Sequence, residues 1–114
     1  MPEKRIFITY PPSTNRLWRT VKGRMIKSEA YRHWIAENKH LGYGLKCIDG
    51  HYGLTLHCTP PDKRARDLDN LIKPVSDLLQ YIGAVTNDSN MQALSMFWTQ
   101  SDKPGVEALV YPWP

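Results

Sequence analysis

The sequence has few cysteines and no long apolar run, and both shortages narrow the class of protein. Its 114 residues include two cysteines, Cys47 and Cys58, too few for the disulfide framework of a small secreted domain. We therefore expect reduced thiols, one of them in a core strand. No run of about 18 apolar residues could form a membrane span, and no apolar segment of signal-peptide length precedes Pro11. The sequence predicts a cytoplasmic protein with no membrane partner.

Two common kinds of metal site also lack the residues they need. The four histidines and two cysteines show no paired short spacing of zinc ligands, so a zinc protein is a minor alternative that stoichiometric metal analysis would test. A calcium loop beginning at Asp67 needs Gly at its sixth position and Glu at its twelfth, where the chain has Ile72 and Leu78. A calcium loop is therefore not expected.

Length and charge indicate one basic domain. A chain of 114 residues with 41% hydrophobic residues can bury a core but is too short for two ordinary domains, so we expect a single domain over residues 1–114. The net charge of +4 suits a polyanionic partner. Basic residues gather in residues 16–32 and 63–66, either as solvated surfaces or as a nucleic-acid footprint.

Apolar periodicity predicts the elements of the first half. Residues 5–10 alternate as a strand that ends at Pro11, and residues 17–28 read as a basic hairpin turning at Gly23. Ser28 is a plausible N-cap for a first helix that ends near Gly42 or Gly44. Residues 52–58 alternate strictly, as in a half-buried strand.

The second half predicts a helix and a closing hairpin. Apolar residues recur at helical spacing from Leu68 to Ile82, and Gly83 is a natural stop. Pro74 means either that regular helix starts only near Ile72 or that its first turn is distorted. Residues 93–99 and 106–111 read as two strands of a hairpin. The predicted fold class is α+β, with two helices packed on one face of a mixed β-sheet.

An acidic pair at the start of the second helix raises the question of function. We expect Asp67 to lie in extended backbone, with its side chain on the same side as that of Asp69. We also expect Asp69 to neighbour Lys73, one helical turn further on. Converging carboxylates repel one another unless a cation lies between them, and Mg²⁺ prefers carboxylate oxygens. The alternative is that one acid caps the helix while the other pairs with Arg66 or Lys73.

Two further acids belong to this part of the chain. Asp77 is about 12 Å along the helix from Asp69, too far to share a metal, so we interpret it as a helix-face residue or one that supports the site indirectly. Asp88 follows in the segment AVTNDSN, where alone it would be an ordinary turn residue.

The central segment RARDLDNLIKPVSDLLQYIGAVTNDSNM resembles the signature of the RusA-like Holliday junction resolvases, and YPPSTNRLWR and GRMIKSEAYRHW resemble that family's opening segment. The resemblance implies a magnesium-dependent endodeoxyribonuclease, with Mn²⁺ an expected substitute, that works as a homodimer and resolves four-way junction DNA by paired symmetric nicks in recombination and repair. It implies that Asp67, Asp69 and Asp88 bind the metal and that Lys73 is the catalytic lysine. Asn87 departs from the family, which often has a second acid there.

The chemistry of these residue types is consistent with phosphodiester hydrolysis. A carboxylate-held Mg²⁺ can activate water and neutralise charge, and a lysine can bind a phosphate or leaving oxygen. We expect Trp18 either to stack on an unpaired base or, more commonly for its type, to pack internally. The residues expected to follow DNA phosphates are Arg16, Arg19, Lys22, Arg24, Lys27, Lys63, Arg64 and Arg66.

Two rival functions remain open at this point. One is a junction-binding protein without catalysis, in which the acids are helix caps. The other is a metal-dependent nuclease or phosphohydrolase with another substrate, such as flaps, replication forks or small phosphoesters. Comparison of branched with linear DNA, with and without Mg²⁺, discriminates among them.

Overall fold

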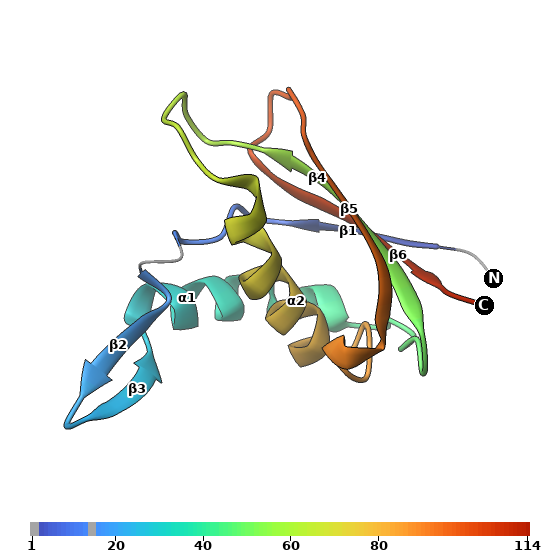
Figure 1. The fold of residues 1–114 in the computed structure, drawn as a ribbon, viewed down its shortest axis with the longest axis horizontal. Coiled ribbons are helices and arrows are strands. Elements are labelled where there is room, and N and C mark those ends of the chain that lie inside the picture. The colour runs from blue at the N-terminus through green and yellow to red at the C-terminus, as the bar shows by residue number, and fades with distance from the viewer. Residues whose placement is uncertain (1–2, 14–15) are drawn as a thin grey trace.

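The computed structural model describes residues 3–13 and 16–114 (Figure 1). Six strands and two α-helices alternate with three short 3₁₀ helices in the described chain. In chain order the elements are β1 (Lys4–Ile8), β2 (Trp18–Val21), β3 (Arg24–Lys27), α1 (Glu29–Asn38), η2 (Lys39–Gly42), β4 (Tyr52–Thr59), η3 (Leu68–Leu71), α2 (Ile72–Tyr81), η4 (Asp88–Asn90), β5 (Met91–Trp98) and β6 (Gly105–Pro112).

Four strands form the main sheet in the order β1-β6-β4-β5. Strand β6 is antiparallel to both β1 and β4, whereas β4 and β5 are parallel, so the sheet is mixed. Strands β2 and β3 form a separate antiparallel ribbon. Its turn residues Lys22 and Gly23 both have positive φ, of 52° and 75°, as a tight hairpin turn requires. The predicted basic hairpin is therefore confirmed.

The predicted closing hairpin is wrong. Strands β5 and β6 do not pair with each other, because β4 lies between them. A helix gives the chain enough length to return and lay the next strand parallel to the previous one, and α2 does this between β4 and β5. The loop after β5 then leads the chain past β4 to its other side. Two alternating segments joined by turn residues look the same in sequence whether or not a third strand separates them.

Both helices cover one face of the main sheet, and the core lies between the helices and the sheet (Figure 1). Leu54 and Leu56 of β4 are fully buried with Val75, Leu78 and Leu79 of α2. Burying one such side chain stabilises a fold by about 1.5–3 kcal/mol. The predicted α+β class, with two helices on one face of a mixed sheet, is confirmed.

The two helix starts follow from local chemistry. Ser28 caps α1, as predicted, because its Oγ accepts a hydrogen bond from the backbone N–H of Tyr31 at 3.1 Å. Regular helix α2 begins at Ile72, which is the first of the two alternatives that Pro74 left open. Pro74 is then the third residue of the helix, where the backbone nitrogen has no helical partner to lose.

No helix in the described ranges is long and apolar enough to cross a membrane.

We predict that the two thiols differ sharply in reactivity. Cys47 is exposed, whereas Cys58 is buried in β4, and burial raises the pKa of its thiol to about 11. At pH 8 the Cys58 thiol should therefore be both protonated and shielded. Maleimide labelling followed by mass spectrometry should give one adduct per native chain and two in urea. Two adducts at equal rates on the native protein would show that β4 is not buried.

Candidate active site

The two acids of the central motif lie just before α2. Asp67 has an extended backbone, with φ −90° and ψ 125°, and Asp69 lies in η3. Both side chains are exposed. Asp67 occupies the cap position of η3, but its side chain makes no capping hydrogen bond. The geometry thus does not match the alternative in which Asp67 caps the helix.

The nearby basic residues pair with other acids. Arg66 pairs with Asp62, and Lys73 pairs with Asp77, whose Oδ1 lies 3.3 Å from Nζ. The Asp69–Lys73 ion pair offered by the helix-cap alternative is absent from the described residues, because Asp69 belongs to a 3₁₀ turn, in which residues four apart do not lie one above the other. Within residues 3–13 and 16–114, no side chain forms an ion pair or hydrogen bond with the Asp67 or Asp69 carboxylate.

Asp88 lies at the other end of α2. It begins η4, and its backbone N–H donates to Oε1 of Gln80 near the end of the helix. Asn87 caps η4, since its Oδ1 accepts from the backbone N–H of Ser89 at 2.9 Å. Asn87 therefore fixes the turn that presents Asp88, a part that sequence reasoning did not assign to it.

The structure brings Asp67 and Asp69 into one short segment but does not gather Asp88 with them. In the part of the chain that the structure describes, no group of three or more His, Cys, Asp or Glu side chains could hold a metal ion. The three expected acids therefore do not form a metal-binding group among the described residues of one chain. The donor chemistry suits a hard cation, but a three-carboxylate centre is not formed by these residues alone.

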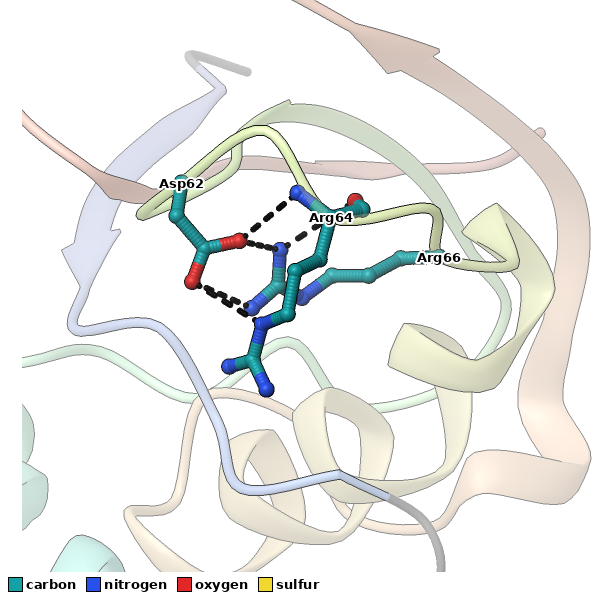
Figure 2. A network of polar contacts seen from close by, with 3 residues as sticks. All are labelled: Asp62, Arg64 and Arg66. Carbon is teal, nitrogen blue, oxygen red and sulfur yellow. Dashed lines mark hydrogen bonds and ion pairs between the residues drawn. The ribbon is translucent and has the colours of Figure 1, made fainter.

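Asp62 organises the basic loop that leads to the acids (Figure 2). Its Oδ1 accepts from the Arg64 backbone N–H at 2.9 Å, and its Oδ2 accepts from Arg66 Nη2 at 3.1 Å. Hydrogen bonds from Arg66 and from the Arg64 backbone hold the pKa of the Asp62 carboxyl below its usual value. The Arg66 guanidinium also lies over the Tyr10 ring, 5.6 Å from its centroid. Arg66 is thus held on two sides.

A pocket of about 780 Å³ opens beside Asp67. It is bounded by the segment after β1, by the polar side of α1 and by the basic loop. The lining residues with ionisable or amide side chains are Tyr10, Arg16, His33, Glu37, Arg64, Arg66, Asp67 and Asn70. Sequence reasoning missed His33 and Glu37, although their spacing of four residues on a helix places them on one face. It also gave Asn70 no role, and the structure places that side chain at the same pocket.

The basic hairpin presents its charges to solvent. Arg19, Lys22 and Arg24 are exposed, as is Lys27, whose Nζ lies 5.5 Å from the centroid of the Trp18 ring. Trp18 packs edge-on against Tyr31, with 5.8 Å between ring centroids. This internal contact favours packing over base stacking for Trp18. Arg16 and Lys63 are exposed as well.

Comparison with known proteins adds independent information. Residues 9–111 match the family model described as Endodeoxyribonuclease RusA. The chain belongs to the RusA endodeoxyribonuclease family. It is 35% identical over 92 residues to Crossover junction endodeoxyribonuclease RusA of Escherichia coli strain K12, which covers 75% of this chain and 74% of that protein. The proteins of the same name from Shigella sonnei strain Ss046 and Enterobacteria phage 82 are 35% and 34% identical, with the same coverage.

Membership of the RusA family confirms the resemblance read from the central motif. The matched segment begins one residue after β1 and ends within β6, so it includes both helices and every candidate site residue. The shared features are therefore those of the whole fold and not of a single loop.

Proposed function

We propose that this chain acts as a single RusA-like endonuclease domain, a structure-specific endodeoxyribonuclease that depends on magnesium. It resolves Holliday junctions by paired symmetric nicks during DNA recombination and repair in the cytoplasm. The observation that carries the proposal is the pair of exposed carboxylates, Asp67 and Asp69, which no described side chain neutralises. Asp67 also lines a pocket that contains Arg16, Arg64 and Arg66. The names of the similar proteins, crossover junction endodeoxyribonucleases, support the choice of a branched substrate.

The proposed metal ligands are Asp67, Asp69 and Asp88. Carboxylate oxygens without protein partners are the ligands that Mg²⁺, or Mn²⁺ in its place, prefers. When bound, such an ion supplies an activated water and relief of charge on the phosphoryl oxygens. Asp67 and Asp69 suit this role by position, whereas Asp88 lies apart in one chain and joins the set on the strength of the family motif alone.

Lys73 is the proposed catalytic lysine. Its side chain is 59% exposed at the start of α2, close in sequence to both acids, so Nζ can reach a bound phosphate. The ammonium group would donate to a scissile phosphate oxygen or to the leaving oxygen, where negative charge increases in the transition state. Its effect should therefore appear mainly in the rate of cleavage.

The basic residues are proposed to bind the DNA backbone. The hairpin β2–β3 exposes four basic residues, and Arg16, Arg64 and Arg66 line the pocket beside Asp67. Contacts to phosphates fix the register of a protein on DNA but read no base sequence, so such binding follows the shape of a junction. The proposed phosphate-binding residues are Arg16, Arg19, Lys22, Arg24, Lys27, Lys63, Arg64 and Arg66.

A homodimer is proposed because paired nicks need two active centres and each chain carries one acidic cluster. Strand β5 offers a surface for the second copy. It is an edge strand, it has no charged residue, and Leu94, Phe97 and Trp98 on it are 42%, 49% and 40% exposed. Apolar side chains on an unpaired edge favour association with another protein surface.

A junction-binding protein without nuclease activity is the second candidate. The separation of Asp88 from Asp67 and Asp69 favours it, because the described residues of one chain do not form a three-ligand site. This candidate predicts junction binding without metal and no cleavage with it. A nuclease for other branched DNA would instead cut flaps or forks faster than four-way junctions. Incubation with a four-way junction, a flap, a fork and a linear duplex, each with and without Mg²⁺, decides among the three.

We predict that Asp67→Asn, Asp69→Asn and Asp88→Asn each abolish most cleavage without unfolding the protein. Loss of one group that stabilises charge commonly lowers a rate by about 100-fold or more. Each change also removes a negative charge near the phosphates, so metal-free junction binding should hold or tighten. The measurements are cleavage rate across a Mg²⁺ titration, metal affinity, junction affinity and melting temperature.

The matched control for these variants is Asp102→Asn, which removes a carboxylate from an exposed loop outside the site. Variants of Asp67 and Asp69 that cut at wild-type rates would exclude these two acids from the catalytic metal site. A wild-type rate for Asp88→Asn alone would remove Asp88 from the ligand set.

We predict that Leu94→Asp converts the dimer to a monomer. A charge placed on the edge of β5 would have to be buried in the interface unpaired, which is strongly unfavourable. Sedimentation velocity should give a wild-type mass of two chains and a variant mass of one, with loss of paired nicking. Tyr43→Asp, at a residue that is 96% exposed and is not part of β5, is the control. A wild-type protein that stays monomeric on and off junction DNA would contradict the proposal.

We predict that Asp62→Asn tightens DNA binding and makes it more sensitive to salt. Without the carboxylate, Arg64 and Arg66 are free to contact phosphates, and each new phosphate contact steepens the slope of log K against log salt by about 0.9. Fluorescence anisotropy with a labelled junction at several salt concentrations measures this slope. Asp102→Asn removes the same charge elsewhere and serves as control. If the variant instead bound DNA more weakly, Asp62 would be shown to orient Arg66 for contact with DNA.

A further inference from the structure

Asp77 connects the proposed catalytic lysine to the protein core. Its Oδ1 accepts from Lys73 Nζ at 3.3 Å, one helical turn away, and its Oδ2 accepts from the Tyr31 hydroxyl at 3.0 Å. Lys73 and Asp77 belong to α2, whereas Tyr31 belongs to α1. The two carboxylate oxygens of Asp77 thus join an exposed lysine on one helix to a buried tyrosine on the other.

Tyr31 is a fixed anchor for this carboxylate. It is fully buried, and its backbone N–H donates to Oγ of the N-cap Ser28. Its ring packs against those of Trp18 and Trp34, at centroid distances of 5.8 and 6.0 Å. Burial, together with the negative charge of Asp77, raises the pKa of the Tyr31 hydroxyl above its usual value. The hydroxyl therefore stays a hydrogen-bond donor to Asp77 at any working pH.

The Lys73–Asp77 ion pair adds little to the stability of the fold. An exposed ion pair between residues four apart on a helix is a weak stabiliser, because water screens it and the side chains lose freedom. Lys73 could also turn away from Asp77, since its four-carbon stem has many rotamers. A carboxylate that is held in place by a second hydrogen bond is instead suited to orienting a charged group.

We propose that Asp77, held in place by Tyr31, is a positioning residue for Lys73 in DNA cleavage. Asp77 restricts the directions in which the lysine ammonium points, so that the charge is already near the reacting phosphate when DNA binds. Tyr31 limits the movement of Asp77 in turn. Neither residue contacts the substrate in this scheme. The inference depends on the proposed nuclease function and on the role of Lys73 in it.

The decisive variant is Asp77→Asn. The amide oxygen can still accept from Tyr31, but the negative charge that attracts Lys73 is gone. Single-turnover cleavage of a four-way junction should fall by about 10- to 100-fold, the loss that misplacing a reacting group can cause. Junction affinity should hold or tighten, because the change removes a negative charge, and the melting temperature should stay at its wild-type value. Asp77→Glu, which restores the charge within reach of Lys73, should recover part of the rate. The matched control is Asp102→Asn.

A double-mutant cycle separates positioning from an independent role. In a Lys73→Ala background, Asp77→Asn should cause no further loss, since the group it positions is absent. Tyr31→Phe keeps the ring packing and removes only the hydroxyl, so it should lower the rate in wild-type protein and leave Lys73→Ala unchanged. Tyr43→Phe, at an exposed tyrosine, is its control. Equal losses from Asp77→Asn in both backgrounds would overturn the inference.

Two outcomes distinguish failure of the inference from failure of the proposed function. If wild-type protein does not cut junctions with Mg²⁺, the nuclease assignment and the inference both fall. If wild-type protein cuts and Lys73→Ala is slow, but Asp77→Asn cuts at the wild-type rate, only the positioning role is wrong. A wild-type rate for Tyr31→Phe would remove Tyr31 from it.

Discussion

The position at which α2 begins determines the arrangement of the candidate site, and Pro74 sets that position. A proline nitrogen has no hydrogen to donate to the carbonyl four residues before it, so a regular helix cannot include Pro74 much beyond its first turn. The helix therefore starts at Ile72, and the preceding residues form a 3₁₀ turn and an extended segment. That irregular backbone holds Asp67 and Asp69 in solvent, with Asp67 at the pocket. The same start leaves Lys73 to pair with Asp77, further along the helix.

The acids near the site fall into two groups with different physical roles. Asp62 and Asp77 each accept hydrogen bonds from two other residues and hold basic or phenolic side chains in place. Asp67 and Asp69 have no such donors among the described residues. Because a folded chain usually satisfies its charged groups where a partner is near, acids left unpaired beside arginines are candidates for a ligand from outside the chain. This contrast, more than the number of acids, supports a role in metal or phosphate chemistry.

Sequence patterns predicted the elements that depend on local periodicity. The alternation of residues 52–58 predicted β4, and the three- and four-residue steps of α2 predicted its buried face. The start of regular helix at Ile72 was one of the two alternatives that Pro74 left open. The pairing of β5 was missed because strand neighbours depend on the path of the whole chain. His33 and Glu37 were missed because nothing in their local sequence indicates that α1 faces the basic loop. The Asp69–Lys73 ion pair of the helix-cap alternative is absent among the described residues, because Asp69 lies in a 3₁₀ turn and not in an α-helical one.

The topology also explains why Asp88 lies apart from Asp67 and Asp69. In a strand–helix–strand crossover with parallel strands, the helix runs opposite to both strands. Its first residues therefore lie near the end of the first strand, and its last residues near the start of the second. Asp67 and Asp69 precede α2, and Asp88 follows it and leads into β5 (Figure 1). A helix of ten residues is about 15 Å long. The number of residues between Asp69 and Asp88 thus reflects the length of the crossover from β4 to β5. For that reason the motif spacing identifies the fold well, whereas the sharing of one metal by all three acids needs evidence from outside a single chain.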